Sequence, residues 1–299
     1  MSNAISWPRK TREIHSHHFD STRWNGFEFR DDDIVIGTWA KAGTTWTQQI
    51  VSQLVFHGAE DAAVFDVSPW VDLRAIPRGP MFASIEAQRH RRYLKTHLPV
   101  DALVFSPKAK YIYVPRDARD VVMSQYNHHV NATQLWYDMM NSPGLVGPRL
   151  ERPNSDIRQY FNEWVAWDGY PWWPFWSHIQ SWWDIRRLPN VLLIHFANLK
   201  ADMPSEIRRI AKFLTIDVDA AEWPKILEHC SFDYMKAHAN RFMMDAVFDG
   251  GAKTFVNKGT NGRWRDVLTA DDVAFYERTL AAQLTPDCAH WLTTGHLPH

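Results

Sequence analysis

The stretch from Asp33 to His57 constrains the fold more than any other part of the 299-residue chain. A short apolar run at 34–36 predicts a buried strand, and small and polar residues with a single lysine, Lys41, follow it. From Thr44 on, apolar residues recur at helical spacing, at 46, 50, 51, 54 and 55. A strand, a tight loop and a helix N-terminus form a layout that holds phosphate, because backbone N–H groups and the helix dipole favour the anion.

The loop differs from the Walker A loop of ATP-binding proteins, in which the lysine directly follows the last glycine. Here Lys41 stands two residues before Gly43, and Thr44 follows that glycine. Gly43 lets the backbone approach an anion closely, and Thr44 and Thr45 add hydroxyl donors. A lone Gly-Thr-Thr is more typical of an ordinary turn with a solvated lysine, but the complete succession favours an anion site of a different type.

Residues 38–46, Thr-Trp-Ala-Lys-Ala-Gly-Thr-Thr-Trp, resemble the 5′-phosphosulfate loop of the cytosolic sulfotransferases. That family transfers a sulfonate group from 3′-phosphoadenosine-5′-phosphosulfate (PAPS) to a hydroxyl or amine and releases adenosine 3′,5′-bisphosphate (PAP). The family usually has Tyr-Pro before the lysine and Ser after it, whereas this chain has Trp39, Ala40 and Ala42. The resemblance covers 31–283 through three separated motifs and implies a PAPS-dependent sulfotransferase.

Composition narrows the class of protein. The hydrophobic share of 45% and the charged share of 22% are those of a globular protein. A formal net charge of −1 gives no general field for nucleic acid. Two cysteines make no disulfide framework, and the sequence has no apolar signal core and no membrane-spanning stretch. We therefore expect a cytoplasmic protein with no nucleic-acid or membrane partner. The 16 tryptophans pack in the core or line a site for an apolar ligand.

Strand and helix patterns alternate and predict one α/β domain over 1–299, with a mainly parallel sheet flanked by helices and a P-loop-like nucleotide-binding architecture. Residues 1–30 form a solvated N-terminal arm in this prediction, and its three clustered histidines at 15, 17 and 18 are not a metal site. The predicted strands are 34–36, 92–99, 110–117 and 191–196. The predicted helices begin near 44, 121, 157, 203, 220 and 271, and Thr269 caps the last of them. Residues 239–262 are predicted to be a loop.

Residues 95–99, Lys-Thr-His-Leu-Pro, match a family segment whose histidine is the catalytic base. His97 follows a predicted strand, at the sheet edge where α/β proteins place their sites, and imidazole suits deprotonation of a hydroxyl. Lys95 points to the same face of an extended chain. From spacing alone, a histidine at a strand end is more often structural, and a solvated charge at the strand end is the alternative interpretation of Lys95. The resemblance instead implies that His97 is the base and that Lys41 and Lys95 stabilise the transferring sulfonate.

Residues 114–126 and 255–264 resemble the segments that hold the 3′-phosphate in the family. The matching residues are Arg116, Ser124 and Lys258. Arginine offers a bidentate fork to phosphate, although for Arg116 taken alone a surface ion pair with Asp117 or Asp120 is the default interpretation. The family arginine before the lysine is Asn257 here, a change that removes a charge, and Arg263 is a candidate to compensate for it.

Adenine contacts map onto Trp46 as a stacking face and onto 230–232, where Cys230 replaces a family threonine. The family tyrosine at this site falls on Phe196 or His195. The residues that the resemblance assigns to PAPS are Lys41, Ala42, Gly43, Thr44, Thr45, Trp46, Arg116, Ser124, Phe196, Cys230, Phe232, Asn257, Lys258 and Gly259.

The acceptor is predicted to be a hydrophobic small molecule, a phenol or apolar alcohol, or an amine. The candidate pocket residues are Trp39, Met81, Phe82, Tyr137 and Phe242, with Met139, Trp173 and Met243 beside them. Sulfonate carries less charge than phosphate, so no metal is expected. The alternatives are a P-loop phosphotransferase using ATP and Mg²⁺, and a nucleotide-binding protein without activity. The partial match to the family's dimer motif leaves a monomer or a homodimer open.

Overall fold

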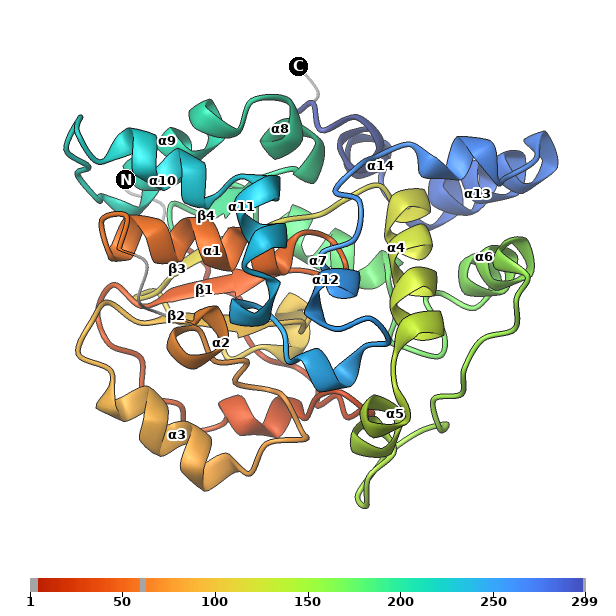
Figure 1. Ribbon diagram of the computed structural model, residues 1–299, viewed down its shortest axis with the longest axis horizontal. Coiled ribbons are helices and arrows are strands. Elements are labelled where there is room, and N and C mark those ends of the chain that lie inside the picture. The colour runs from red at the N-terminus through yellow and green to blue at the C-terminus, as the bar shows by residue number, and fades with distance from the viewer. Residues whose placement is uncertain (1–4, 60–62, 298–299) are drawn as a thin grey trace.

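The centre of the protein is a parallel sheet of four short strands (Figure 1). The structure is a computed structural model that describes residues 5–59 and 63–297. The strand order is β2-β1-β3-β4, and every pair is parallel. The strand bounds are β1 Ile34–Gly37, β2 Tyr93–Thr96, β3 Lys110–Tyr113 and β4 Val191–Leu193. The predicted parallel α/β architecture is therefore confirmed.

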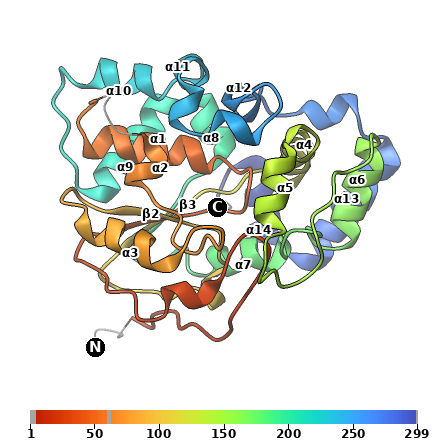
Figure 2. The same ribbon diagram turned by 60° about the horizontal axis from the view of Figure 1, so that its bottom comes forward.

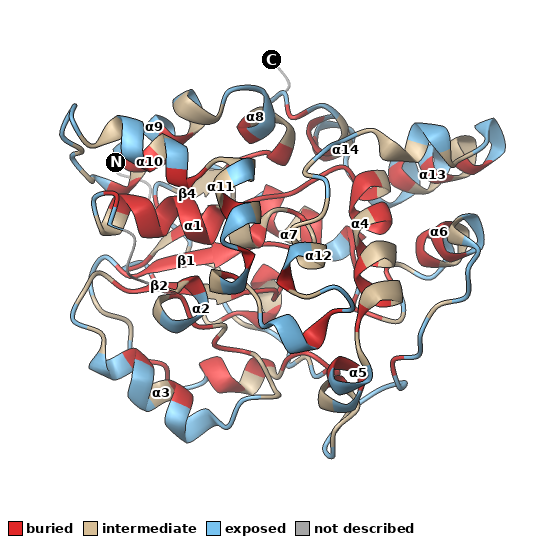
Figure 3. Cartoon of the chain, in the orientation of Figure 1, coloured by how far each residue is buried: buried red, intermediate tan, exposed pale blue. Residues whose placement is uncertain are grey.

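Helices cover both faces of the sheet because successive strand residues point to opposite sides. Ile34 and Ile36 belong to one buried cluster, together with apolar residues of α1 and α9. Val35 belongs to the other cluster, which contains Trp182 of α7. Figure 3 shows the strands and the inner sides of α1 and α4 as buried. The core thus fixes strand register on both faces and leaves the strand ends available for the site.

The helices follow the strands in the order of an α/β fold. At α13 the predicted cap, Thr269, forms a capping box with Asp272, and at α4 the side chain of Asp117 accepts from the N–H of Arg119. The helix bounds are α1 Thr44–Val55, α2 Val64–Val67, α3 Arg78–Ala87, α4 Ala118–Asn131, α5 Gln134–Met140, α6 Ile157–Ala166, α7 Trp176–Asp184, α8 Phe196–Ala201, α9 Met203–Leu214, α10 Trp223–His229, α11 Phe232–Ala237, α12 Ala252–Phe255, α13 Ala270–Gln283 and α14 Pro286–Thr294.

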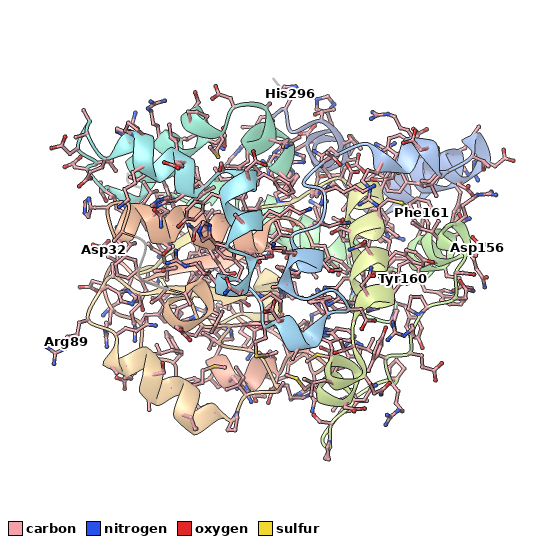
Figure 4. The ribbon with its side chains drawn as sticks, in the orientation of Figure 1. Asp32, Arg89, Asp156, Tyr160, Phe161 and His296 are labelled. Atoms are coloured by element: carbon pink, nitrogen blue, oxygen red, sulfur yellow. The ribbon has the colours of Figure 1, made fainter. Side chains whose placement is uncertain are left out.

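The outer right-hand part of the molecule shows how aromatic residues attach peripheral helices. On α6, Tyr160 and Phe161 point toward α4, whereas Asp156, the α6 N-cap, lies at the outer edge (Figure 4). Tyr160 makes an edge-on contact with Tyr126 of α4 at 5.4 Å between ring centroids. Many of the tryptophans pack in the same way, and Trp24, Trp39, Trp164, Trp176 and Trp182 are fully buried.

Some element predictions need correction. The segment 191–196 leaves the sheet after Leu193, and Phe196 begins α8. The 239–262 segment is not simply a loop, because it contains α12 and two short 3₁₀ turns. Helix α14 was not predicted at all, although Thr285 followed by Pro286 is a helix-start signal.

The prediction of a solvated N-terminal arm is wrong for residues 16–24. His17 and His18 are buried, as are Phe19 and Trp24. The indole of Trp24 donates to the buried Asp72 carboxylate at 3.0 Å, so this segment forms part of the core. Burial lowers the pKa of His17 to about 4, which keeps its imidazole neutral. Among the described residues no helix is long and apolar enough to cross a membrane.

Candidate active site

The carboxyl ends of three neighbouring strands bring the predicted reactive side chains together. Strand β1 leads into the loop that carries Lys41, β2 leads directly to His97, and β3 leads to Arg116 before α4 begins. Because β1 is the central strand of these three, its loop lies between the other two residues. This is the edge at which parallel α/β sheets place their sites.

The β1–α1 loop has the shape of an anion cradle. Gly43 has a φ of 106°, and a Cβ there would lie 2.7 Å from the Phe196 ring, so a side chain would fill the space. The N–H groups of the first turn of α1 have no partners within the helix. The hydroxyls of Thr38 and Thr44 are 2.6 Å apart and brace the loop across its turn.

Lys41 lies in the same loop with a left-handed φ of 65°. Its Nζ is 3.2 Å from Nδ1 of His128 on α4 and 4.3 Å above the centre of the Phe255 ring. Burial, together with the nearby cations Lys95 and Arg116, lowers the pKa of Lys41 to about 7. An arriving anion would reverse this shift, so Lys41 is arranged to meet negative charge.

His97 is buried, and its tautomer follows from its hydrogen bonds. Nδ1 lies 2.7 Å from the carbonyl oxygen of Thr38. A carbonyl oxygen can only accept, so Nδ1 carries the hydrogen and Nε2 of the neutral ring carries the lone pair. Burial, with Lys95 nearby, holds the pKa of His97 well below its usual value of 6.5. The imidazole is therefore neutral and oriented to accept a proton at Nε2.

Asp72 organises the side of the site behind His97. Its buried carboxylate accepts from the indoles of Trp24 and Trp70, at 3.0 and 2.7 Å, and from the backbone N–H of His97 at 3.5 Å. Lys95 Nζ lies 4.1 Å above the Trp70 ring. Burial lowers the pKa of Lys95 to about 8, and attraction to Asp72 opposes that shift.

Arg116, which follows β3, holds the loop that contains Thr260 and Asn261. Its guanidinium donates to the Thr260 carbonyl at 2.9 Å and to Oδ1 of Asn261 at 3.1 Å, and it lies 4.3 Å above the Phe196 ring. Burial lowers its pKa to about 10, well above neutral pH. The Gly262 N–H donates to Asp120 at 2.8 Å and holds the same loop against α4.

These side chains face one cavity of about 750 Å³ at the strand ends. Figures 1 and 2 both place α12 between α11 and α4, where these elements form part of the cavity wall. The residues assigned to PAPS that line it are Lys41, Gly43, Thr44, Thr45, Trp46, Arg116, Ser124, Phe196, Phe232, Asn257, Lys258 and Gly259. Arg263, the candidate to compensate for Asn257, also lines it.

Two of the assigned residues lie behind the cavity wall. Ala42 and Cys230 are buried in the two hydrophobic clusters and do not line the cavity. The carbonyl of Cys230 still supports the site, since it accepts from the Trp46 indole at 2.8 Å. Of the two candidates for the family tyrosine, Phe196 faces the cavity, whereas His195 is turned toward Ala197 N–H.

The acceptor prediction needs partial correction. Met81, Met139, Phe242 and Met243 line the cavity. Trp39, Phe82, Tyr137 and Trp173 do not, because they pack elsewhere: Trp39 donates to the Trp173 carbonyl at 3.3 Å, Phe82 packs on Phe27, and the Tyr137 hydroxyl donates to the His129 carbonyl. The aromatic wall consists instead of Trp70, Trp136 and Trp172 with His18 and His128.

Sequence reasoning missed His128, Asp72 and this aromatic wall. His128 stands four residues after Ser124 on the predicted helix, so both lie on one helix face, and this spacing was the available signal. Nothing local marks Asp72, because its indole partners are 2 and 48 residues away.

The three cations of the site share an electrostatic property. Among the described residues, Lys41, Lys95 and Arg116 have no carboxylate within ion-pair distance, although Arg116 is buried and the two lysines are half-buried. Charges removed from water are normally paired, so the cavity is suited to an anionic ligand. No group of three or more His, Cys, Asp or Glu side chains within 5–59 and 63–297 could hold a metal ion.

A substitution tests the cradle. Gly43→Ala forces a Cβ into the Phe196 ring at a left-handed φ, and we expect the affinity for PAP to fall about tenfold or more because the loop must move. Gly79→Ala is the matched control, since nothing lies within 4 Å of a Cβ there. Calorimetric titration of both variants with PAP checks this; equal affinities would contradict the cradle.

Comparison with known proteins shows the family to which the chain belongs. A family model described as the sulfotransferase domain matches residues 31–286. The chain is 30% identical over 307 residues to the glycolipid sulfotransferase of Mycobacterium bovis BCG, with 92% of each protein covered. It is 31% identical over 264 residues to sulfotransferase 1 family member D1 of Rattus norvegicus, covering 84% of this chain and 82% of that protein. The crystal structure of mouse sulfotransferase SULT7A1 complexed with PAP shares the fold, with a TM-score of 0.68 and 23% identity over 91% of this chain and 92% of that one.

The chain therefore belongs to the sulfotransferase family, as the 38–46 segment predicts.

Proposed function

We propose that this sulfotransferase uses PAPS as its donor and that His97 is the general base. The observation that carries the proposal is the meeting, in one cavity, of an oriented imidazole lone pair and three cations that have no carboxylate partner among the described residues. PAPS supplies a sulfonate on an anionic nucleotide, and these side chains match both parts of it in kind.

His97 Nε2 takes the proton of the acceptor hydroxyl. At the same time the acceptor oxygen forms a bond to sulfur, and the bond between sulfur and the 5′-phosphate oxygen of PAPS breaks. Lys41 and Lys95 hold positive charge where negative charge develops on the bridging oxygen and on the sulfonate. Thr38 fixes the ring of His97, and Asp72 fixes the backbone from which it projects. Because His97, Thr38 and Asp72 are buried and the two lysines are half-buried, each electrostatic contribution is stronger than it would be in water.

The β1–α1 loop, α4 and the 255–264 segment hold the nucleotide. Gly43, Thr44 and Thr45 receive the 5′-phosphate at the α1 N-terminus. Arg116 and Ser124 receive the 3′-phosphate, with Lys258 and Arg263 at the cavity wall supplying the charge that Asn257 lacks. Trp46 and Phe232 present ring faces for adenine.

We also propose a small-molecule acceptor with a hydroxyl and a cytoplasmic location. The apolar lining of the cavity supports the acceptor class. Both cysteines are buried free thiols, which supports a reducing compartment.

Calorimetry tests the donor assignment. PAP should bind at micromolar or lower dissociation constant in the presence of EDTA, and ATP with Mg²⁺ should bind far more weakly, because Lys41 precedes the glycine instead of following it. Preferential binding of ATP with Mg²⁺ would overturn the proposal in favour of a phosphotransferase.

The affinity for PAP should depend on pH. The pKa of Lys41 is lowered from 10.5 to about 7 in the free protein, so its charge is present below that pH and is lost as pH rises through it. Bound anion favours the charged lysine, so binding above about pH 7 takes up a proton and weakens by up to about tenfold per pH unit. Titration between about pH 6 and pH 9 in buffers of different ionisation enthalpy measures this uptake. A flat profile would show that Lys41 does not meet the anion.

A further inference from the structure

His18 lines the cavity from the N-terminal segment, which lies before the 31–286 match to the family model. The residue is only 4% exposed, and hydrogen bonds fix the backbone around it. The carbonyl of His18 accepts from the backbone N–H of Arg74 at 2.8 Å, and the carbonyl of His17 accepts from the Arg74 guanidinium at 3.1 Å. The imidazole of His18 therefore has a fixed place in the cavity wall.

The tautomer of His18 follows from two hydrogen bonds in series. Nε2 of His17 lies 2.6 Å from the carbonyl oxygen of Pro171. Because a carbonyl oxygen can only accept, Nε2 of His17 carries the hydrogen, and Nδ1 of this neutral ring is an acceptor. Nδ1 of His18 lies 2.8 Å from that nitrogen and donates to it. Burial holds the pKa of His18 well below 6.5, so its ring is neutral and its lone pair is on Nε2.

Nε2 of His18 is an acceptor without a donor. Within 5–59 and 63–297 no residue forms a hydrogen bond with this atom. Unlike Nε2 of His128, which is unpartnered and fully enclosed, Nε2 of His18 is not sealed from the cavity. Polar atoms of buried side chains are normally hydrogen-bonded, so an oriented lone pair at this place indicates that a ligand supplies the hydrogen.

The neighbours of His18 place it at the acceptor end of the cavity. Its ring stacks on Trp172 at 4.4 Å between centroids and lies 6.1 Å from Trp70. Trp70 also packs edge-on against His97, at 4.7 Å between centroids. None of the rings that His18 contacts belongs to a residue assigned to PAPS. An acceptor whose hydroxyl lies at His97 and whose body lies along Trp70 therefore extends toward His18.

We propose that His18 is a specificity-determining residue, whose Nε2 accepts a hydrogen bond from a second hydroxyl of the acceptor while the first hydroxyl reacts at His97. His17 is then a positioning residue, because it sets the tautomer of His18. The preferred acceptor is a ring with two hydroxyls, and methylation of the second hydroxyl removes the hydrogen that His18 needs. This inference rests on the proposed function, since it places the reacting hydroxyl at His97.

Pairs of acceptors test the role of His18. Catechol, resorcinol, hydroquinone and the positional isomers of cyclohexanediol are each compared with their own monomethyl ether, which keeps an oxygen that accepts but does not donate. In at least one pair, kcat/KM should be about threefold to tenfold higher for the diol than for the ether, after correction for the two equivalent hydroxyls of the diol. This comparison uses the unmodified protein, so the proposal can fail even if substitutions at the buried position impair folding.

Variants of the N-terminal segment identify the group responsible. His18→Phe keeps a ring on Trp172 but removes the lone pair, so the ratio of kcat/KM between diol and ether should fall to about one. The ratio is the readout because it cancels a general change in activity. His18→Gln should restore part of the preference, since its amide oxygen accepts hydrogen bonds.

His17→Phe separates positioning from contact. It frees His18 to carry its hydrogen on Nε2, so kcat/KM for the ether should rise relative to that for the diol. His15→Phe is the matched control and should keep the ratio of the unmodified protein, because His15 is an exposed residue of the same segment that does not line the cavity.

Equal kcat/KM for every diol and its ether, or a preference that His18→Phe leaves unchanged, would overturn the role of His18 and leave the proposed function standing. Equilibrium binding with PAP present, followed by tryptophan fluorescence, separates the two failures. A preference for the diol in binding that His18→Phe removes, without any transfer, would support the role of His18 and contradict the proposed function. Absence of both transfer and a preference in binding would overturn both.

Discussion

His97→Ala should reduce kcat about 10²–10⁴-fold and leave the affinity for PAP unchanged. The Nδ1 of His97 is committed to the Thr38 carbonyl, which leaves only Nε2 for chemistry. Alanine removes the proton acceptor without touching the cations that face the nucleotide. Steady-state kinetics with saturating PAPS and calorimetry with PAP measure the two effects separately.

Controls distinguish loss of a base from loss of structure. Added imidazole should restore part of the activity of His97→Ala, because the substitution leaves a space where a small base can bind, whereas a misfolded variant would not respond. His290→Ala, at an exposed position on α14, should behave like the unmodified protein. Unchanged turnover in His97→Ala would refute the role of His97 as base.

Lys41→Met should lower kcat about 10²–10³-fold, in the range seen when one group that stabilises developing charge is removed. Methionine keeps an unbranched side chain of similar length that can pack on Phe255. It lacks the ammonium group, which in Lys41 lies 4.3 Å above that ring. The same variant should also reduce the dependence of PAP affinity on pH, because the group with a pKa of about 7 is gone.

Lys258→Met is the matched comparison, since Lys258 lines the same cavity but is exposed. Solvent weakens the electrostatic contribution of Lys258. We therefore expect the KM for PAPS to rise only about twofold to fivefold and kcat to stay unchanged. Equal losses in both variants would mean that burial of Lys41 gives it no special part in the transfer.

The proximity of the residues predicted to react could be foreseen from the sequence, whereas their roles were implied only by the family resemblance. Lys41, His97 and Arg116 each follow a predicted strand, and parallel strands end at one edge of the sheet, so the meeting of these residues follows from the topology. The strand lengths were less predictable. The segment after Leu193 is still apolar, but the side chain of His195 accepts from Ala197 N–H and starts α8.

Long-range packing explains the errors. Trp24, in the N-terminal segment, is buried, and its indole donates to Asp72, which is distant in sequence. The sequence around either residue does not indicate this contact. In the same way Trp39 and Tyr137 looked like pocket residues but donate to the carbonyls of Trp173 and His129 in the core. Aromatic composition indicates burial without saying whether a ring faces a core or a cavity.

The central claim is that this protein transfers a sulfonate from PAPS without a metal-bound nucleotide. The direct measurement is an assay with sulfur-labelled PAPS, a panel of phenols and alkyl glucosides, and EDTA, with γ-labelled ATP and Mg²⁺ in a parallel reaction. The account predicts labelled sulfate ester and an equal amount of PAP in the first reaction and no phosphorylated product in the second. Phosphoryl transfer from ATP, with no sulfonate transferred from PAPS, would contradict it.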